Sequence, residues 1–278
     1  MQGPGLFASP AAPAWTPGEA QRRRSRLLAA MRNWGYDSVE ALHAASVDDP
    51  EWFWRAVVDD LRIEFRQPFD KVREDSDGKP LPRWFVGGQL NVADLCSHRH
   101  AAGPSADKVA VVYEGDSGQQ RSLTYRELDA EVRRFAANLT AMGVRRGDRV
   151  VLFLPVVPEA VVAFLGCAAI GAISVPAFTG YGPEALATRL RESEAKVLVT
   201  ADGTTRRGKR VALKQVADEA LESAPSVRTS IVVAHLGEDV PMKDGRDVYW
   251  HDLDQAPDPA PPVAMDSNDP LTIIYTSR

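Results

Sequence analysis

Residues 149–200 read RVVLFLPVVPEAVVAFLGCAAIGAISVPAFTGYGPEALATRLRESEAKVLVT, and apolar runs alternate there with segments of helical spacing. The pattern predicts strands at 149–154, 172–178 and 196–200, and helices at 158–170 and 184–194. Alternation of this kind is typical of a parallel sheet, because each crossover helix packs back onto the sheet. We therefore predict an α/β fold with a layered, largely parallel sheet and flanking helices.

A capping box opens the helix that precedes this segment. Thr124 and Glu127 are spaced so that the hydroxyl and the carboxylate can each accept from the other residue's backbone N–H. Apolar residues then recur at helical spacing up to Gly143, a residue type common at helix ends. These signals predict a helix over 125–142. Further predictions are strands at 108–113, 230–234 and 271–275, a helix at 214–221, a loop at 237–245 and a linker at 257–262.

The N-terminal third of the chain has a different character. Residues 1–20 are rich in Pro, Ala and Gly, and we interpret them as a disordered tail. Apolar and aromatic residues at helical spacing predict helices over 21–34 and 50–65. We therefore predict that a helical extension over 21–100 precedes the α/β domain, which occupies 101–278.

Composition excludes several classes of protein. A formal net charge of −5 gives no global attraction to nucleic acid or to anionic membranes, so neither is expected as a partner. Prolines interrupt the longest apolar stretch, and no segment is long enough for a membrane span or a signal peptide. Two cysteines, Cys96 and Cys167, indicate a reducing compartment, and the cytoplasm is the expected location.

Residues 96–100, Cys-Ser-His-Arg-His, contain three potential metal ligands. Their spacing differs from that of Cys-x-x-Cys zinc sites, and no second cluster accompanies them. We therefore expect no metal site in this segment. The remaining histidines are isolated, and no catalytic residue can be assigned from their order.

A glycine pattern at 180–185 admits two interpretations. Gly180 and Gly182 follow a predicted strand and open a predicted helix, and Asp202 lies at the spacing typical of an NAD-binding fold. Pro183, however, removes an N–H from the helix start that would hold a pyrophosphate. A plain turn between strand and helix is the alternative.

Four cations surround Gly208, namely Arg206, Arg207, Lys209 and Arg210. Such a loop can clamp a phosphate through charge-assisted hydrogen bonds. The alternative is a solvated basic loop, and the residues alone leave both interpretations open.

Several segments together resemble AMP-forming acyl-CoA synthetases, in particular the acetyl-CoA synthetase branch. They are WFVGGQLN at 84–91, LTYREL at 123–128, GAISVPAF at 171–178, FTGYGPEA at 178–185, the ADGTTRRGK stretch at 201–209 and YTS at 275–277. The resemblance covers about 49–277. The chain departs from the family pattern at Thr179, at Lys209 (usually Arg) and at Arg278, where the first glycine of the phosphate loop is expected.

The resemblance implies binding roles for six residues. Phe178, Gly180, Arg206 and Lys209 match positions beside the nucleotide end of CoA. Thr276 and Ser277 match the start of the loop that holds the ATP phosphates. A lysine at 209 supplies a point charge without the bidentate geometry of arginine.

The resemblance also implies a reaction. A small carboxylic acid attacks the α-phosphate of ATP, with Mg, to give an acyl-adenylate and pyrophosphate, and the CoA thiol then displaces AMP. The family's catalytic residues match no position up to Arg278, so the chain is expected to be a truncated N-terminal portion without adenylation activity. A separately encoded C-terminal part is then an expected partner. The alternatives are a non-catalytic CoA- or nucleotide-binding fragment, and an NAD-binding Rossmann protein.

Overall fold

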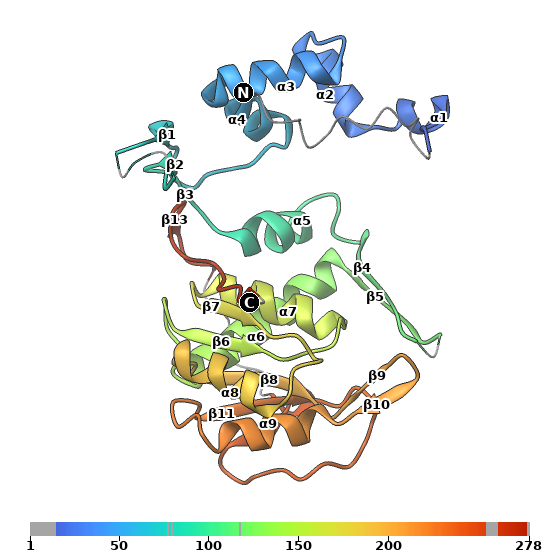
Figure 1. The fold of residues 1–278 in the computed structure, drawn as a ribbon, viewed down its shortest axis with the longest axis vertical. Coiled ribbons are helices and arrows are strands. Elements are labelled where there is room, and N and C mark those ends of the chain that lie inside the picture. Colours follow the sequence, from blue (N-terminus) through green and yellow to red (C-terminus); the bar gives the residue numbers. More distant parts are fainter. Residues whose placement is uncertain (1–14, 77, 79, 117, 254–260, 277–278) are drawn as a thin grey trace, which may run out of the picture. The chain divides into compact units, whose positions relative to one another are not determined.

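The computed structural model describes residues 15–76, 78, 80–116, 118–253 and 261–276. The chain divides into two compact units, residues 1–63 and residues 64–278 (Figure 1). The second unit contains the α/β sheet and all the residues that the sequence proposes for binding. Residues 1–14 of the expected tail and most of the expected linker lie outside the described residues.

Between residues 15 and 63 the described chain is helical. Its helices are α1 (Glu19–Arg23), α2 (Arg26–Trp34), α3 (Val39–Asp48) and α4 (Pro50–Asp60). Aromatic rings join them, since the Trp34 ring lies edge-on to those of Trp52 and Phe53, each with a centroid separation of 6.0 Å. The first unit ends at residue 63, so residues 64–100 of the extension predicted over 21–100 belong to the second unit.

Two helix boundaries in this unit differ from the prediction. The helix expected over 21–34 is interrupted at Ser25, because the Ser25 hydroxyl accepts from the Leu28 N–H and caps a new helix. The helix expected over 50–65 ends at Asp60, and Arg62 has a positive φ of 51°. A local side-chain cap and a left-handed residue thus override the longer apolar pattern.

The second unit is built on a five-stranded parallel sheet, which confirms the predicted fold class. The strands in spatial order are β12 (Asp247–Tyr249), β11 (Thr229–Val233), β8 (Val197–Ala201), β6 (Arg149–Leu152) and β7 (Ile173–Pro176). Apolar residues make up most of β6 and β8, since strands covered on both faces have no solvent side.

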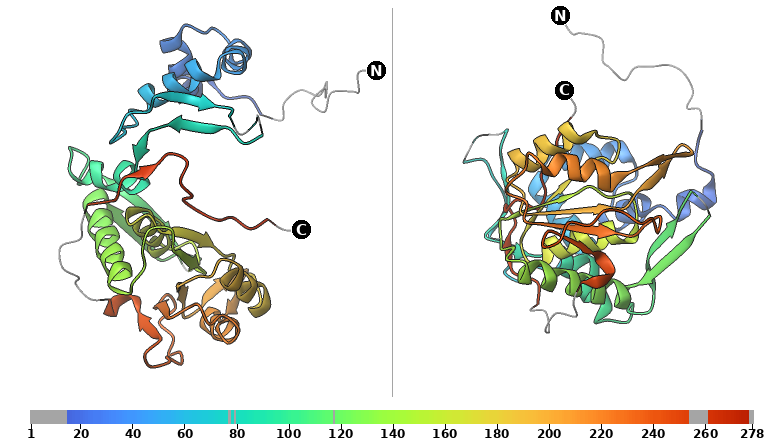
Figure 2. Two further views of the ribbon diagram at one scale, coloured as in Figure 1. Left: turned by 90° about the vertical axis from the view of Figure 1, so that its left-hand side faces the viewer. Right: turned by 90° about the horizontal axis from the view of Figure 1, so that it is seen from below.

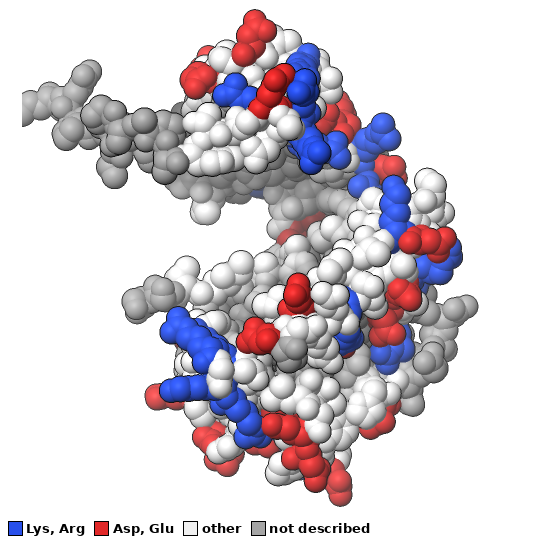
Figure 3. Space-filling view, turned by 90° about the vertical axis from the view of Figure 1, so that its right-hand side faces the viewer, with Lys and Arg blue, Asp and Glu red and all other residues white. Residues whose placement is uncertain are grey.

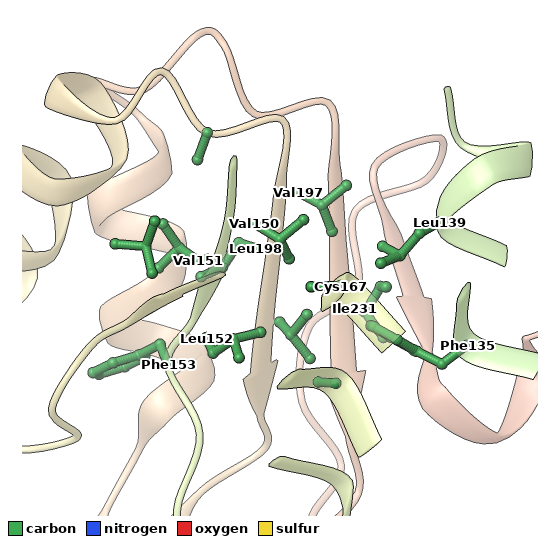
Figure 4. Packing of buried hydrophobic residues seen from close by; sticks show 14 of the residues in the cluster. Phe135, Leu139, Val150, Val151, Leu152, Phe153, Cys167, Val197, Leu198 and Ile231 are labelled. Carbon is green, nitrogen blue, oxygen red and sulfur yellow. The ribbon is translucent and has the colours of Figure 1, made fainter. Parts of the chain in front are cut away.

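Helices cover both faces of this sheet (Figure 2). One pair is α6 (Tyr125–Ala141) with α7 (Pro158–Ala169), and the other is α8 (Pro183–Glu192) with α9 (Leu213–Leu221). Figure 4 shows how the core forms between α6 and the sheet, where Phe135 and Leu139 point toward Ile231 and Cys167. Phe135 is fully buried and stacks on the Trp250 ring at 4.7 Å between centroids.

Short antiparallel pairs and irregular helical turns complete the unit. The pairs are β1 (Lys71–Glu74) with β2 (Arg83–Val86), β3 (Gln89–Leu90) with β13 (Met265–Asp266), β4 (Val109–Glu114) with β5 (Gln120–Thr124), and β9 (Thr204–Arg206) with β10 (Lys209–Val211). The turns are a π-helix η1 (Asp94–His98), α5 (Arg99–Ala101) and a 3-10 helix η2 (Trp250–Asp252). Among them, β9 and β10 contain Arg206 and Lys209, two of the residues that the resemblance places beside CoA.

The strand predicted over 271–275 is wrong in extent. Thr272 forms a single parallel bridge to Ser174 of β7, and the Ile273 N–H donates to the Ser174 carbonyl at 2.9 Å. The segment therefore lies along the β7 edge of the sheet but does not pair further. Ile274 is 74% exposed, so the segment is not the buried strand that its apolar residues suggest.

The predicted capping box is present at the start of α6. The Glu127 N–H donates to Thr124 Oγ1 at 3.2 Å, and the Thr124 N–H donates to Glu127 Oε2 at 2.8 Å. The bond from the Thr124 N–H also holds the pKa of Glu127 below its usual value. At the other end, Gly143 has a positive φ of 82°, as expected for the residue that ends a helix.

Thr124→Ala is expected to lower the free energy of unfolding by about 1 kcal/mol, because it leaves the Glu127 N–H without its side-chain acceptor. Urea denaturation followed by circular dichroism measures the change. Thr140→Ala in the same helix is the matched control, since the Thr140 hydroxyl only donates to the Ala136 carbonyl of a bonded turn. Equal losses in the two variants would contradict a capping role.

Within the described part of the chain, no helix has both the length and the apolar character required to cross a bilayer.

Candidate functional site

The proposed CoA-binding residues lie at one edge of the parallel sheet. Phe178 and Gly180 follow the carboxyl end of β7, and the β9–β10 hairpin follows the carboxyl end of β8. Because β6 pairs in parallel with both β7 and β8, these carboxyl ends face the same edge. Ligands of open α/β sheets bind at this edge.

Arg206 and Phe178 are in direct contact across this edge. The guanidinium carbon of Arg206 lies 4.6 Å from the centroid of the Phe178 ring, a cation–π geometry. Phe178 is 51% exposed, so one part of its ring is covered by arginine and another is open. A ring and a cation in this arrangement can bind a purine and a phosphate.

Gly180 is required by this contact. A Cβ built at Gly180 would collide with the Arg206 guanidinium and with the Phe178 ring. At Gly182, two residues on, an added Cβ would meet nothing within 4 Å. The structure therefore brings Phe178, Gly180 and Arg206 together, and it distinguishes the two glycines.

Lys209 lies directly across the hairpin from Arg206. The two residues are register partners in the β9–β10 pair, and directly opposite side chains lie on the same face of an antiparallel ribbon. Arg207 and Gly208 form the turn with positive φ values of 51° and 71°, as a two-residue hairpin turn requires. Figure 3 views the side on which this hairpin lies and shows Lys and Arg side chains grouped beside acidic ones.

Arg210 contacts a different part of the chain from Arg206 and Lys209. Its guanidinium makes a two-pronged ion pair with Glu238, and the hydrogen bond to Glu238 raises the pKa of Arg210. This pair ties β10 to the loop after β11. Of the cations around Gly208, Arg206 and Lys209 thus share one face of the hairpin, whereas Arg210 is engaged with Glu238.

Asp202 fixes the base of the same hairpin. Its buried carboxylate accepts backbone N–H bonds from Gly203 at 2.7 Å, His235 at 2.9 Å, Leu236 at 3.0 Å and Glu238 at 2.9 Å. The ends of β8 and β11 are joined in this way. The carboxylate is saturated, so it has no free position for the ribose hydroxyls of a dinucleotide.

The NAD interpretation of residues 180–185 loses its support for this reason. Gly182 is the N-cap of α8 and Pro183 is its first residue, as in an ordinary turn between strand and helix. No side-chain cap is present at this helix start. With Asp202 occupied and Pro183 lacking an N–H, neither anchor of a dinucleotide site is in place.

The segment that resembles the start of the phosphate loop lies against α8. Thr276 is exposed, and Ser277 lies outside the described residues. Tyr275 is half-buried, and burial together with the negative charge of the Glu192 carboxylate raises the pKa of Tyr275. The Arg189 guanidinium carbon lies 5.0 Å from the Tyr275 ring centroid, so Arg189 and Glu192 of α8 both lie near this tyrosine.

The sequence alone gives no signal that Arg189, Glu192 and Tyr181 lie beside the candidate site residues. Arg189 lies one turn before Glu192 on α8, and the sequence pattern of this helix indicates only that it is amphipathic. These contacts form because the chain at Tyr275 returns to α8, and a linear pattern contains no signal of that return.

The cysteine and histidine cluster of residues 96–100 falls on η1 and α5. His98 contacts Asp129 and Arg133 of α6, and His100 packs on the Tyr125 ring at 4.6 Å between centroids. Among the described residues, no three His, Cys, Asp or Glu side chains are arranged to hold a metal ion. Cys167 is buried, which raises the pKa of its thiol to about 12, so it acts as a packed apolar residue.

Comparison with known proteins yields consistent matches along the chain. The family model "AMP-binding enzyme" matches residues 98–277, and the model "Acetyl-coenzyme A synthetase N-terminus" matches residues 39–96. An acetyl-coenzyme A synthetase of Desulfatibacillum aliphaticivorans is 43% identical over 250 residues, which are 88% of this chain and 38% of that protein. One of Syntrophus aciditrophicus is 44% identical over 244 residues, 87% of this chain and 37% of that protein.

A solved structure agrees with these sequences. The acetoacetyl-CoA synthetase from Streptomyces lividans superimposes with a TM-score of 0.83 at 30% identity, over 96% of this chain and 41% of that one. The chain thus spans well under half the length of the proteins it matches. The first family model covers more than half of the chain, in the region that contains the sheet and the β9–β10 hairpin. The chain therefore belongs to the AMP-binding enzyme family and is similar, within it, to the acyl-CoA synthetases.

Proposed function

We propose that this chain forms the N-terminal part of an AMP-forming acid–CoA ligase of the acetyl-CoA synthetase type. Its site residues bind the nucleotide end of CoA, and Thr276 and Ser277 begin the loop for the ATP phosphates. The organisation proposed is a tail over 1–20, an extension over 21–100 and the first part of the AMP-binding domain from 101. Its two free cysteines support a location in the cytoplasm.

The observation behind this proposal is the Arg206–Phe178 contact above Gly180. An exposed aromatic ring offers a stacking surface for adenine, and a guanidinium on the adjacent strand end offers paired N–H donors for phosphate. Lys209, on the same face of the hairpin, adds a second charge without a fixed geometry. These groups fit an adenosine carrying phosphates, which is the nucleotide end of CoA.

The proposed reaction has two steps. A carboxylate oxygen bonds to the α-phosphorus of ATP, pyrophosphate leaves, and Mg in the family balances the phosphate charge. The sulfur of CoA then bonds to the acyl carbon and AMP leaves. Phe178, Gly180, Arg206 and Lys209 contribute to the second step by holding CoA, whereas Thr276 belongs to the site of the first step.

Gly180→Ala is expected to weaken CoA binding about tenfold, a loss of about 1.4 kcal/mol, because the added methyl group pushes Arg206 off the Phe178 ring. Isothermal titration calorimetry of CoA into the 278-residue chain measures this loss. Arg206→Ala removes the charge itself and is expected to weaken binding at least as much.

Gly182→Ala is the matched control for this experiment. The same methyl group enters open space there, and the N-cap exchange affects only the start of α8. Equal CoA affinities for wild type and Gly180→Ala would contradict the assignment of the site. Wild-type chain that takes up no CoA would remove the CoA-binding part of the proposal.

An assay of ATP–pyrophosphate exchange in the presence of a carboxylic acid tests whether the 278-residue chain alone can form the acyl-adenylate. The 278 residues include Thr276 and Ser277 but no glycine-rich loop after them, so the chain by itself is expected to show no exchange above background. A polypeptide supplying the remaining length of a relative is expected to restore exchange when it is added. Exchange by the purified chain alone would show that adenylation needs none of those residues.

A further inference from the structure

Arg189 of α8 is held between two tyrosine rings. Its guanidinium carbon lies 4.0 Å from the Tyr181 ring centroid and 5.0 Å from that of Tyr275. Its Nη1 donates to the Ala185 carbonyl at 2.6 Å, within its own helix. Its Nε–H is buried and has no hydrogen-bond partner among the described residues. A buried N–H without a partner is unfavourable, so the aromatic faces explain the position of this side chain better than its hydrogen bonds do.

Tyr181 connects Arg189 to the proposed CoA site. The Tyr181 and Phe178 rings meet edge-to-face at 5.5 Å between centroids and an interplanar angle of 86°. Phe178 in turn lies under Arg206. Contact is therefore unbroken from Arg206 through Phe178, Tyr181 and Arg189.

Tyr275 extends this chain of side-chain contacts beyond Arg189. Burial and the charge of the Glu192 carboxylate, which lies one turn beyond Arg189 on α8, raise the pKa of the Tyr275 hydroxyl, so residues of one helix act on both its ring and its hydroxyl. Tyr275 immediately precedes Thr276 and Ser277. The position of the backbone at Thr276 thus depends on where α8 holds the Tyr275 ring.

We propose that Arg189 is a positioning residue that links the CoA nucleotide site to the start of the ATP phosphate loop, by packing between Tyr181 and Tyr275. The roles of the two ends rest on the function proposed above, whereas the link itself rests on the contacts just described. A ligand phosphate that draws Arg206 away from Phe178 changes the packing of Phe178 on Tyr181. Arg189 then transmits this change to Tyr275, because a single guanidinium contacts both tyrosines.

Carbon-13 NMR of the tyrosine rings tests the link in the whole 278-residue chain. The chain has six tyrosines, and Tyr181→Phe and Tyr275→Phe identify the two signals of interest. In Arg189→Leu without ligand, both signals are expected to shift. Arg191→Leu removes the same charge from the same helix, but Arg191 is exposed and bonds Ser223 and Thr188 hydroxyls, so neither signal is expected to shift.

Addition of CoA gives the decisive comparison. In the wild type, CoA is expected to shift the signals of Tyr181 and of Tyr275. In Arg189→Leu, CoA is expected to shift Tyr181 alone and to bind about fivefold more weakly. Arg189→Lys keeps a cation that can sit on one ring but not lie flat between two, so an intermediate response of Tyr275 is expected.

Two outcomes overturn the link. One is that both tyrosine signals in unliganded Arg189→Leu match the wild type, and the other is that CoA shifts Tyr275 equally in both proteins. If Arg189→Leu does not fold, Tyr181→Leu interrupts the same chain of contacts at a partly buried residue, and a CoA response of Tyr275 that survives this change overturns the link as well. Absence of any CoA effect counts against the proposed CoA site, while the unliganded comparison still decides the role of Arg189.

Discussion

Asp202→Asn is expected to lower the free energy of unfolding of the α/β unit by about 3 kcal/mol. The carboxylate accepts four backbone N–H groups from Gly203, His235, Leu236 and Glu238. Asparagine keeps one acceptor oxygen but replaces the other with an NH₂ donor, which then faces N–H groups. Urea denaturation measures the loss, and calorimetry is expected to show weaker CoA binding, because the β9–β10 hairpin starts two residues later.

Asp239→Asn is the matched control on the same loop. Asp239 is exposed, so the same change of chemistry there is expected to alter stability by no more than about 0.5 kcal/mol. Should Asp202→Asn unfold at the same urea concentration as this control, the carboxylate would not be what joins the ends of β8 and β11.

Phe135→Ala is expected to cost about 4 kcal/mol of unfolding free energy, the largest effect predicted for this chain. Phe135 is fully buried, stacks on Trp250 and lies where a Cβ at Gly166 of α7 would collide with its ring. Removal of the ring leaves a cavity between α6, α7 and η2 that rigid neighbours cannot fill. Urea denaturation followed by circular dichroism gives the difference.

Phe178→Ala removes the same atoms from an exposed position. Because Phe178 is 51% exposed, its loss is expected to cost at most about 1 kcal/mol of stability while CoA binding weakens. A small loss for Phe135→Ala, comparable to that of Phe178→Ala, would mean that the α6–α7 core can close around the missing ring.

Local residue order was sufficient to predict four of the five strands of the parallel sheet, all except β12, and the four helices that cover it. The capping box of Thr124 and Glu127 and the terminal Gly143 set α6 to within one residue, since both signals act through backbone groups of the same helix. The apolar runs gave β6 and β8 for a similar reason, because strands covered on both faces have no polar alternation.

Boundaries that depend on distant contacts were predicted poorly. Residues 271–275 look like a buried strand, yet they make one bridge to Ser174 because a strand extends only as far as a neighbour pairs with it. Ser25 divides a helix that hydrophobic spacing joins, because a hydroxyl competes locally for the backbone N–H of Leu28.

For the candidate site, the sequence by itself determined the chemistry: the glycine after β7, the cations of the hairpin and the family that this order resembles. The tertiary structure alone decided which groups meet. It places Arg206 on the Phe178 ring and pairs Arg210 with Glu238. It also saturates Asp202 with backbone N–H groups and places Arg189 between Tyr181 and Tyr275. The physical reason is that these contacts join segments far apart in the chain, and their geometry follows from how parallel strands align their carboxyl ends rather than from any local spacing.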